Sequence, residues 1–218
     1  MVQLREGMLL ADKAQHALQT ALKSGQLRGG QFLSMSQLVD LLDCPIAAIR
    51  EAVKQACSQG LLVTLPKRGI QVMDVTPESI QGCLDFRMVL DQEGARRRIS
   101  RGTVGQLPYL SKQHEKMRDT NLAGSATSLS QDAIATDLAL HDFLADGLEN
   151  QQLLAAYDAN RTRIAIIQNA RPFVQDRIKS AMDEHLAIIK ALESSDVAAA
   201  SQAIKYHFKQ TLRWWGVA

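Results

Sequence analysis

The spacing of apolar residues in the first sixty positions predicts three amphipathic helices. Apolar residues recur every three or four positions from about Met8 to Lys23, and Gly25 is placed to end that helix. Ser34 and Gln37 have the spacing of a capping box, which predicts the start of a short second helix. Pro45 opens a third. Its predicted buried face consists of Ile49, Ala52, Val53 and Ala56.

The hydrophobic period then changes from that of a helix to that of a strand. The runs LLVTL and IQVMDV are short and β-prone, and Pro66-Lys67-Arg68-Gly69 separates them. This pattern predicts a β-hairpin with a basic tip. Three helices followed by such a hairpin is the order of a winged helix-turn-helix, a fold that binds DNA. Thr76 and Pro77 then suit the start of another helix, so we place a domain boundary between residues 75 and 76.

Only helical patterns follow that boundary, which makes the predicted fold class mainly α. The second domain, residues 76–218, is expected to be an all-α bundle of about six helices, and we see no internal repeat. The expected helices span roughly 78–100, 104–121, 128–147, 151–169, 173–193 and 197–214.

Composition narrows the class of protein. The chain has 218 residues, of which 46% are hydrophobic and 22% are charged, which is typical of a globular protein with a core. No run of about 18 apolar residues occurs, so no membrane span is expected, and the N-terminus lacks the pattern of a signal peptide. Three widely spaced cysteines indicate reduced thiols in a cytoplasmic protein. The small excess of positive charge lies entirely within residues 1–75, where DNA would bind.

One carboxylate and three imidazoles in the second domain form a candidate site for a divalent metal. Asp137 and His141 are four residues apart and so share one face of a helix. His185 and His207 each lie eleven residues from Asp196, at the break between two expected helices, so an antiparallel hairpin would place them at a similar height. Imidazole with carboxylate suits Zn, Ni, Fe, Mn or Co, and these ligand types do not identify which of the metals is bound.

These motifs resemble a known family. The stretch ALKSGQLRGGQFLSMSQLVDLLDCPIAAIREAVKQACSQGLLVTLPKRGIQV resembles the DNA-binding domain of GntR-type bacterial transcription regulators. The stretches DFRMVLDQEGARRRI, DLALHDFLADGLENQQLL and EHLAIIKALESSDVAAASQAIKYHF resemble the all-α effector domain, called the FCD domain, of the FadR subgroup. The resemblance covers nearly the whole chain, with the motifs in the expected order.

The resemblance implies a homodimer that binds operator DNA through two winged helices. It also implies that a small molecule, commonly a carboxylate, changes DNA affinity through the helical domain. The family's metal ligands map onto Asp137, His141, His185 and His207. Arg87 matches an arginine of the family and could grip an effector carboxylate; its alternative is a solvated ion pair with Asp91.

The DNA-binding part departs from the family pattern. Met35 and Ser36 stand where a Glu-Arg pair is common, and Ile46, Ala47 and Ala48 stand where Arg-Thr-Pro is common. Each bidentate arginine contact to guanine contributes about 1–3 kcal/mol of discrimination, so the operator should differ or be bound weakly. The expected DNA-contacting positions are Ser36, Ile46, Ala47, Arg50, Lys54, Lys67 and Arg68.

Two other functions remain open at this point. The chain could be a family member with degenerate DNA binding that serves as a ligand-binding module, or a metal-dependent hydrolase. The absence of an H-E-x-x-H motif argues against the hydrolase, and we expect no enzyme activity. No other candidate ligands accompany His16 and His114, so no functional role is predicted for either. The run Arg96-Arg97-Arg98 is expected to form a solvated or interface face.

Overall fold

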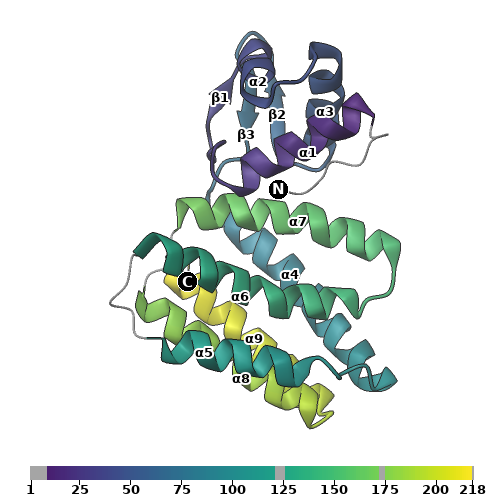
Figure 1. Ribbon diagram of the computed structural model, residues 1–218, viewed down its shortest axis with the longest axis vertical. Helices are drawn as coiled ribbons and strands as arrows, with labels where there is room; N and C mark the ends of the chain where they lie inside the picture. The colour runs from purple at the N-terminus through teal and green to yellow at the C-terminus, as the bar shows by residue number, and fades with distance from the viewer. Residues whose placement is uncertain (1–8, 121–125, 172–174, 218) are drawn as a thin grey trace. The chain divides into compact units, whose positions relative to one another are not determined.

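The computed structural model describes residues 9–120, 126–171 and 175–217, and it divides into two compact units. The described residues up to Ser79, with Arg161–Ala170, form the first unit. The second consists of the described residues of Ile80–Asn160 and Arg171–Ala218 (Figure 1). Met8, the predicted start of the first helix, lies outside the described residues, as do the expected helix ends at residues 121 and 173. The predicted domain boundary between residues 75 and 76 stays a prediction.

The first unit has the predicted winged helix-turn-helix. The Ser34 hydroxyl accepts a hydrogen bond from the backbone N–H of Gln37. The Gln37 side chain in turn accepts one from the backbone N–H of Ser34, which completes the capping box. Three strands form a sheet of order β1-β3-β2, with both pairs antiparallel. The elements are α1 (Leu10–Lys23), β1 (Phe32–Leu33), α2 (Met35–Leu42), α3 (Ile46–Ser58), β2 (Leu62–Leu65) and β3 (Gly69–Val72).

Strand β1 was not predicted from the sequence. It is two residues long, too short for any alternation of polar and apolar positions to be recognised. The backbone N–H of Gly30 donates to Met73 O at 3.1 Å, which brings the segment alongside β3. The core beneath the sheet contains the predicted buried face of α3, Ile49, Ala52, Val53 and Ala56, whereas Leu10 of α1 is 58% exposed. The fully buried side chains of this core include Leu18, Leu22, Leu38, Ile49, Leu61, Leu62 and Ile70.

The regular elements in the described residues of the second unit are all helices, as the sequence predicts. Six helices contribute to it, of which α4 and α7 also have residues in the first unit. None of the described helices is long and apolar enough to cross a membrane. The helices are α4 (Pro77–Arg101), α5 (Leu107–Asp119), α6 (Ala126–Asp146), α7 (Gln151–Ala170), α8 (Gln175–Glu193) and α9 (Val197–Trp214).

Helices α8 and α9 form the antiparallel hairpin that the two histidines suggested. Ser195 takes a left-handed conformation with φ of 54° at the turn, and Asp196 caps α9 by accepting a bond from the Ala199 backbone at 2.9 Å. Helix α5 packs along α8, and α8 along α9. The turn therefore places residues that are equally distant from Asp196 opposite one another.

Helices α4 and α6 approach each other closely at a glycine. A Cβ atom built on Gly94 would lie 2.0 Å from the carbonyl oxygen of Leu144, far inside any normal contact. Gly94 is therefore required for the distance between these two helix backbones.

The three consecutive arginines of α4 do not form one solvated face. Arg98 Nε donates to the carbonyl of Phe143 at 2.6 Å, its Nη1 donates to the carbonyl of Thr103 at 2.9 Å, and its guanidinium lies 3.7 Å from the centre of the Phe143 ring. Arg97 donates to the carbonyl of Leu148. Only Arg96 is mainly solvated, paired with Glu93. Arg97 and Arg98 therefore bind carbonyls at and just beyond the C-terminal end of α6, which the helix dipole favours.

Removing the Arg98 side chain should destabilise the helical unit. Arg98→Ala leaves the carbonyl of Phe143 without its charged donor, and we expect a loss of about 2 kcal/mol in the free energy of unfolding. Arg96→Ala on the same helix removes the same charge from an exposed site and should cost less than about 0.5 kcal/mol. Urea denaturation of both variants measures the difference, and equal losses would show that Arg98 does not stabilise the end of α6.

Candidate metal centre

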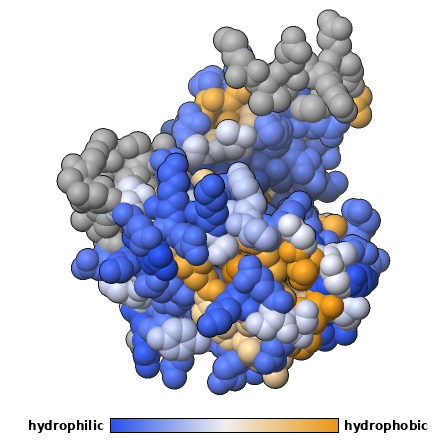
Figure 2. All heavy atoms as spheres, turned by 60° about the horizontal axis from the view of Figure 1, so that its bottom comes forward, coloured by the Kyte–Doolittle hydropathy of each residue, from blue (hydrophilic) through white to orange (hydrophobic). Residues whose placement is uncertain are grey.

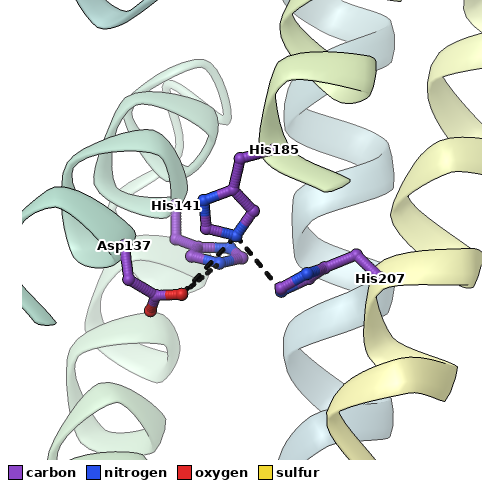
Figure 3. A group of neighbouring side chains, drawn as sticks. All are labelled: Asp137, His141, His185 and His207. Atoms are coloured by element: carbon purple, nitrogen blue, oxygen red, sulfur yellow. Dashed lines mark hydrogen bonds and ion pairs between the residues drawn. The ribbon is translucent and has the colours of Figure 1, made fainter. Parts of the chain in front are cut away.

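Four side chains from three helices converge inside the helical unit. Asp137 and His141 come from α6, His185 from α8 and His207 from α9 (Figure 3). One ligand atom from each lies within 4.8 Å of the others, and all four residues are buried. The structure thus brings together the four residues that the sequence selected. Their role in metal binding stays a prediction.

The atoms that face the common point can be identified from the distances. His185 Nε2 lies 3.3 Å from His207 Nε2 and 3.5 Å from Asp137 Oδ1. His141 Nε2 lies 4.0 Å from the same oxygen of Asp137. Each imidazole therefore presents Nε2 inward, beside one carboxylate oxygen.

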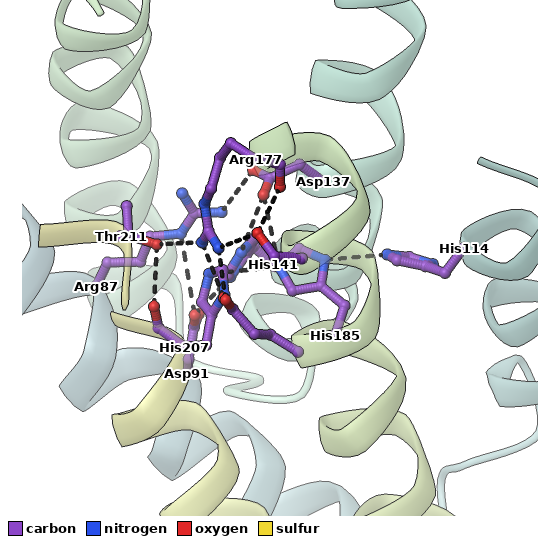
Figure 4. Close-up of polar contacts among 11 residues, drawn as sticks. Arg87, Asp91, His114, Asp137, His141, Arg177, His185, His207 and Thr211 are labelled. Carbon is purple, nitrogen blue, oxygen red and sulfur yellow. Dashed lines mark hydrogen bonds and ion pairs between the residues drawn. The ribbon is translucent and has the colours of Figure 1, made fainter. Parts of the chain in front are cut away.

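The outer nitrogen of each ring is held by a separate buried partner (Figure 4). His141 Nδ1 lies 2.6 Å from Asp91 Oδ2, and His207 Nδ1 lies 2.8 Å from Glu184 Oε2. His185 Nδ1 lies 3.2 Å from Nε2 of His114. A carboxylate that accepts from Nδ1–H leaves the Nε2 lone pair available, which is the tautomer that a metal ligand needs.

An arginine fixes one of these outer carboxylates. Arg177 donates to both oxygens of Glu184, with Nη2 2.8 Å from Oε2, and the same Nη2 donates to the hydroxyl of Thr211 at 2.9 Å. Arg177 and Glu184 are both buried. Burial raises the pKa of Glu184, but hydrogen bonds from His207 and Arg177 outweigh it and the net shift is downward. Glu184 therefore stays an acceptor for His207.

Burial keeps the three inner rings neutral. It lowers the pKa of His141 and of His185 well below the usual histidine value, and Arg87 adds to both shifts. Burial also lowers the pKa of His207, although Glu184 acts in the opposite direction. Neutral imidazoles with inward lone pairs suit a metal cation, because a protonated ring cannot be a ligand.

Asp91 is fully buried beside His141. Burial raises the pKa of Asp91 to about 8, against the opposing effect of Arg87. Without a cation the buried pair therefore shares one proton between Oδ2 and Nδ1. A positive charge at Nε2 of His141 would favour the form in which the proton is on Nδ1 and Asp91 is ionised.

The inner atom of His141 is unsatisfied. Nε2 of His141 is buried and has no hydrogen-bond partner among the residues that the structure describes. A buried polar atom of this kind costs about 1–3 kcal/mol when it is left unpaired. The position beside it, between three nitrogens and a carboxylate, therefore fits a cation.

Arg87 lies beside the same cluster. It is 4% exposed, which excludes the solvated ion pair that was its alternative. Its Nε lies 3.9 Å from Asp91 Oδ2 and its Nη2 3.9 Å from Asp137 Oδ2. Within the described part of the chain, neither nitrogen has a hydrogen-bond acceptor. Arg87 is therefore a buried cation with unused donors next to the candidate metal ligands.

The predicted DNA-contacting residues lie on α2, on α3 and at the tip of the β2–β3 hairpin. All seven are exposed, as contact with DNA requires. Ser36 Oγ lies 2.9 Å from the hydroxyl of Ser34, so its side chain stays beside the N-terminus of α2. The residues are Ser36, Ile46, Ala47, Arg50, Lys54, Lys67 and Arg68.

The outer partners of the histidines were not predicted from the sequence. Asp91 was considered only as a partner of Arg87, and His114 was set aside as an ordinary residue. Glu184, which is next to His185 in the sequence, was not predicted to be a partner of any histidine, yet it lies 2.8 Å from His207 Nδ1. A usable signal was the general need of a metal-binding histidine for a second partner, which makes any acid or histidine on a facing helix a candidate.

Comparison with known proteins identifies the helical unit. The profile of the FCD domain matches residues 83–210, which is more than half of the chain. The chain belongs to the FCD-domain family. All four candidate metal ligands fall inside the FCD domain, and such domains often bind metals.

Two of the proteins similar to this FCD-domain protein are described as transcriptional regulators. An uncharacterized HTH-type transcriptional regulator, YdhC of Bacillus subtilis (strain 168), is 21% identical over 88% of this chain and 84% of its own length. The structure of E. coli McbR/YncC has a TM-score of 0.76 at 16% identity and covers 95% of this chain and 97% of its own. A putative transcriptional regulator GntR from Rhodococcus sp. RHA1 has a TM-score of 0.74 at 17% identity and covers 94% and 96%.

The two structural likenesses show the fold, a winged helix-turn-helix with a helical C-terminal unit, and so confirm the predicted fold class. The FCD match and the HTH-type relative support the resemblance seen in the sequence. The protein is a GntR-type transcription regulator with an FCD domain.

Proposed function

We propose that this FCD-domain regulator binds operator DNA with an affinity set by a small carboxylate effector, and that the effector binds beside a divalent metal in the helical unit. The observation that carries the proposal is the buried group of three Nε2 atoms and one carboxylate oxygen, next to an arginine with unused donors. Neither feature stabilises the helical unit unless a cation and an anion join it.

The metal would be held by Asp137, His141, His185 and His207. Nitrogen and oxygen donors in this ratio suit Zn, Ni, Mn or Fe. A bound divalent ion would supply a positive charge that attracts an anionic ligand. Asp91 and Glu184 would orient the rings of His141 and His207, and the buried surroundings strengthen every charge interaction.

The effector carboxylate would be recognised in part by Arg87. A guanidinium offers two parallel donors that match the two oxygens of a carboxylate. Nε and Nη2 of Arg87 have no hydrogen-bond acceptor in the described residues, and Nη2 lies 3.9 Å from Asp137 Oδ2. A carboxylate on Arg87 would therefore lie near the metal ligands.

Operator binding is assigned to the exposed residues of the winged helix. Arg50 and Lys54 lie on the exposed face of α3, with Ile46 and Ala47 at its first turn. Lys67 and Arg68 at the hairpin tip would contact phosphates. Ser36, in the first turn of α2, would be a further DNA-contacting residue. Because two customary arginines are absent, we expect readout to depend more on Arg50 and on apolar contacts to thymine methyl groups.

We also propose that the regulator is a homodimer. Figure 2 shows hydrophobic residues gathered on the viewed face of the helical unit, among hydrophilic ones. On α4, Phe86 and Val89 share one face and are 40% and 59% exposed. Exposed apolar groups of this kind favour association with a second copy.

The test measures DNA binding by fluorescence anisotropy, using fragments from upstream of the gene itself. Protein loaded with Zn²⁺ or Mn²⁺ is compared with chelated protein, at low and at physiological salt. We expect binding to one fragment with an affinity that changes at least fivefold when a panel of di- and tricarboxylates is added to the metal-loaded form. Identical affinity across all carboxylates and metal states would contradict the proposal.

Three variants sharpen this test. Arg50→Ala should weaken operator binding by about 1–3 kcal/mol, whereas Lys112→Ala, which removes one charge from an exposed site on α5, should leave it unchanged. Arg87→Lys keeps the positive charge but loses the two parallel donors of the guanidinium. It should therefore raise the effector concentration that gives half of the change in DNA affinity, while metal affinity is retained.

Lys67 allows a charge to be removed from the hairpin tip without disturbing the backbone. It is the third residue of a β-turn in which Arg68 N donates to Leu65 O at 3.1 Å, and its φ is 62°. Asparagine tolerates this conformation, so Lys67→Asn should leave the melting temperature unchanged. DNA affinity should fall, and the slope of log K against log salt should shrink by about 1. An unchanged slope would remove Lys67 from the interface.

The absent arginines favour one alternative, a ligand-binding module that no longer binds an operator. In that case the same assay would find no fragment bound specifically at low salt in any metal state. Metal and carboxylate binding to the helical unit would persist and could be followed by calorimetry.

A further inference from the structure

A fourth histidine lies against the candidate metal centre, and sequence reasoning assigned it no role. His114 is on α5 and is fully buried. Its Nε2 lies 3.2 Å from His185 Nδ1, and its Nδ1 lies 2.7 Å from the backbone carbonyl of Leu110, one turn earlier on the same helix. The two rings are tilted by 59°, with centroids 5.2 Å apart, so they meet edge to edge through nitrogen rather than by stacking.

The carbonyl of Leu110 determines where the proton of His114 lies. A carbonyl oxygen can only accept, so Nδ1 of His114 must carry the hydrogen. In a neutral ring Nε2 is then an acceptor. Its neighbour, Nδ1 of His185, must therefore be the donor, and the remaining nitrogen of His185 keeps its lone pair.

That lone pair points at the candidate ligand cluster. His185 Nε2 is the atom 3.5 Å from Asp137 Oδ1 and 3.3 Å from His207 Nε2. A backbone carbonyl on α5 thus sets the tautomer of a ring on α8 through one intervening histidine. Neither His141 nor His207 depends on such a chain, because carboxylates of Asp91 and Glu184 hold their outer nitrogens directly.

We infer that His114 is a positioning residue of the metal centre, which fixes the tautomer and the ring orientation of His185 as a neutral hydrogen-bond acceptor. The inference rests on the proposed function in so far as His185 is a metal ligand. His114 does not touch the metal position. Since it is uncharged, it orients the ring without adding a third outer carboxylate to a site that already contains Asp91 and Glu184.

Two substitutions separate the hydrogen bond from the packing. His114→Gln places an amide oxygen near the position of Nε2, so it can still accept from His185. His114→Leu fills similar space and removes the acceptor, which leaves Nδ1–H of His185 buried and unpaired. A residue that acts only by packing should give similar behaviour in both variants.

The first measurement is Zn²⁺ and Co²⁺ affinity, by competition with a chromophoric chelator, together with the visible absorption spectrum of the Co²⁺ form. We expect His114→Leu to bind 10- to 100-fold more weakly and to change the Co²⁺ spectrum. His114→Gln should recover most of the affinity and the wild-type spectrum. Equal affinity in wild type and His114→Leu, or equal loss in both variants, would overturn the inference.

The second measurement does not require metal binding. Long-range ¹H–¹⁵N correlation spectra of the histidine rings in metal-free protein distinguish the two neutral tautomers. We expect hydrogen on Nδ1 in both His114 and His185 of the wild type, and a changed tautomer ratio at His185 in His114→Leu alone. Hydrogen on Nε2 of His185 in the wild type would refute the inference. Failure of the wild type to bind either metal would instead refute the proposed metal site.

Discussion

Replacing Gly94 with alanine is expected to unfold or severely destabilise the helical unit. The new Cβ would lie 2.0 Å from the carbonyl oxygen of Leu144, whereas real Cβ contacts stay beyond 3.0 Å. The obstacle is backbone and cannot rotate away, so α4 and α6 would have to separate by about 1 Å. Such overpacking costs about 3 kcal/mol or more. Thermal and urea denaturation followed by circular dichroism would measure the loss.

Gly82 on the same helix is the matched control. A Cβ at Gly82 would meet no atom within 4 Å among the described residues, and the position is exposed. Alanine there should stabilise the protein by about 0.5–1 kcal/mol, because it restores helix propensity. Comparable stability in the Gly94 and Gly82 variants would mean that the close contact of α4 with α6 is absent in solution.

The Gly94 variant should also bind metal poorly if it folds. Gly94 lies three residues after Asp91, and Leu144 lies three residues after His141. The close approach therefore occurs one turn from the hydrogen bond of 2.6 Å between Asp91 and His141. Separating the helices by 1 Å would break that bond, with a loss of metal affinity of about 10- to 100-fold.

The sequence predicted the fold well because local signals and tertiary packing agree. The capping box at Ser34, the turn at Asp196 and the change of period at Gly60 each determine a local conformation that the rest of the structure keeps. Strand β1 was missed because its pairing with β3 depends on a distant part of the chain, which two residues cannot encode.

The four candidate metal ligands could be selected from the sequence because their spacing obeys helix geometry. Asp137 and His141 are one turn apart, and the other two are symmetric about a recognisable break. The outer partners could not be selected, because Asp91 and His114 lie on other helices whose rotation and height the sequence does not give. Asp91 also has a local alternative in Arg87, four residues away, and local pairing is the simpler expectation.

The burial of Arg87 was equally beyond sequence reasoning. An arginine four residues before an aspartate normally makes an exposed pair. Here α4 places Arg87 among Asp91, Asp137 and the histidines, and its exposed fraction is 4%. Only the packing of helices that are distant in sequence distinguishes a solvated arginine from a buried one.

Removing one candidate ligand should abolish the stabilisation that the protein gains from metal. Metal that binds only the native state at 100 times its Kd adds about 2.7 kcal/mol. For a helical unit of this size we expect chelation of the wild type to lower the melting temperature by about 10 °C. In His207→Gln, metal affinity should fall by more than about 100-fold, and chelation should leave the melting curve unchanged. Differential scanning calorimetry with and without chelator measures both.

His207→Gln is chosen because the fold should tolerate it. Glu184, the outer partner of His207, keeps its two bonds to Arg177, so no charge is left buried and unpaired. His16→Gln on α1 is the control, since it removes a histidine outside the cluster and should retain the full response to chelation. A chelation shift of the same size in His207→Gln as in the wild type would exclude His207 as a ligand. Because any stabilising metal would then lie elsewhere, that result would also remove the structural basis for an effector that binds beside Arg87.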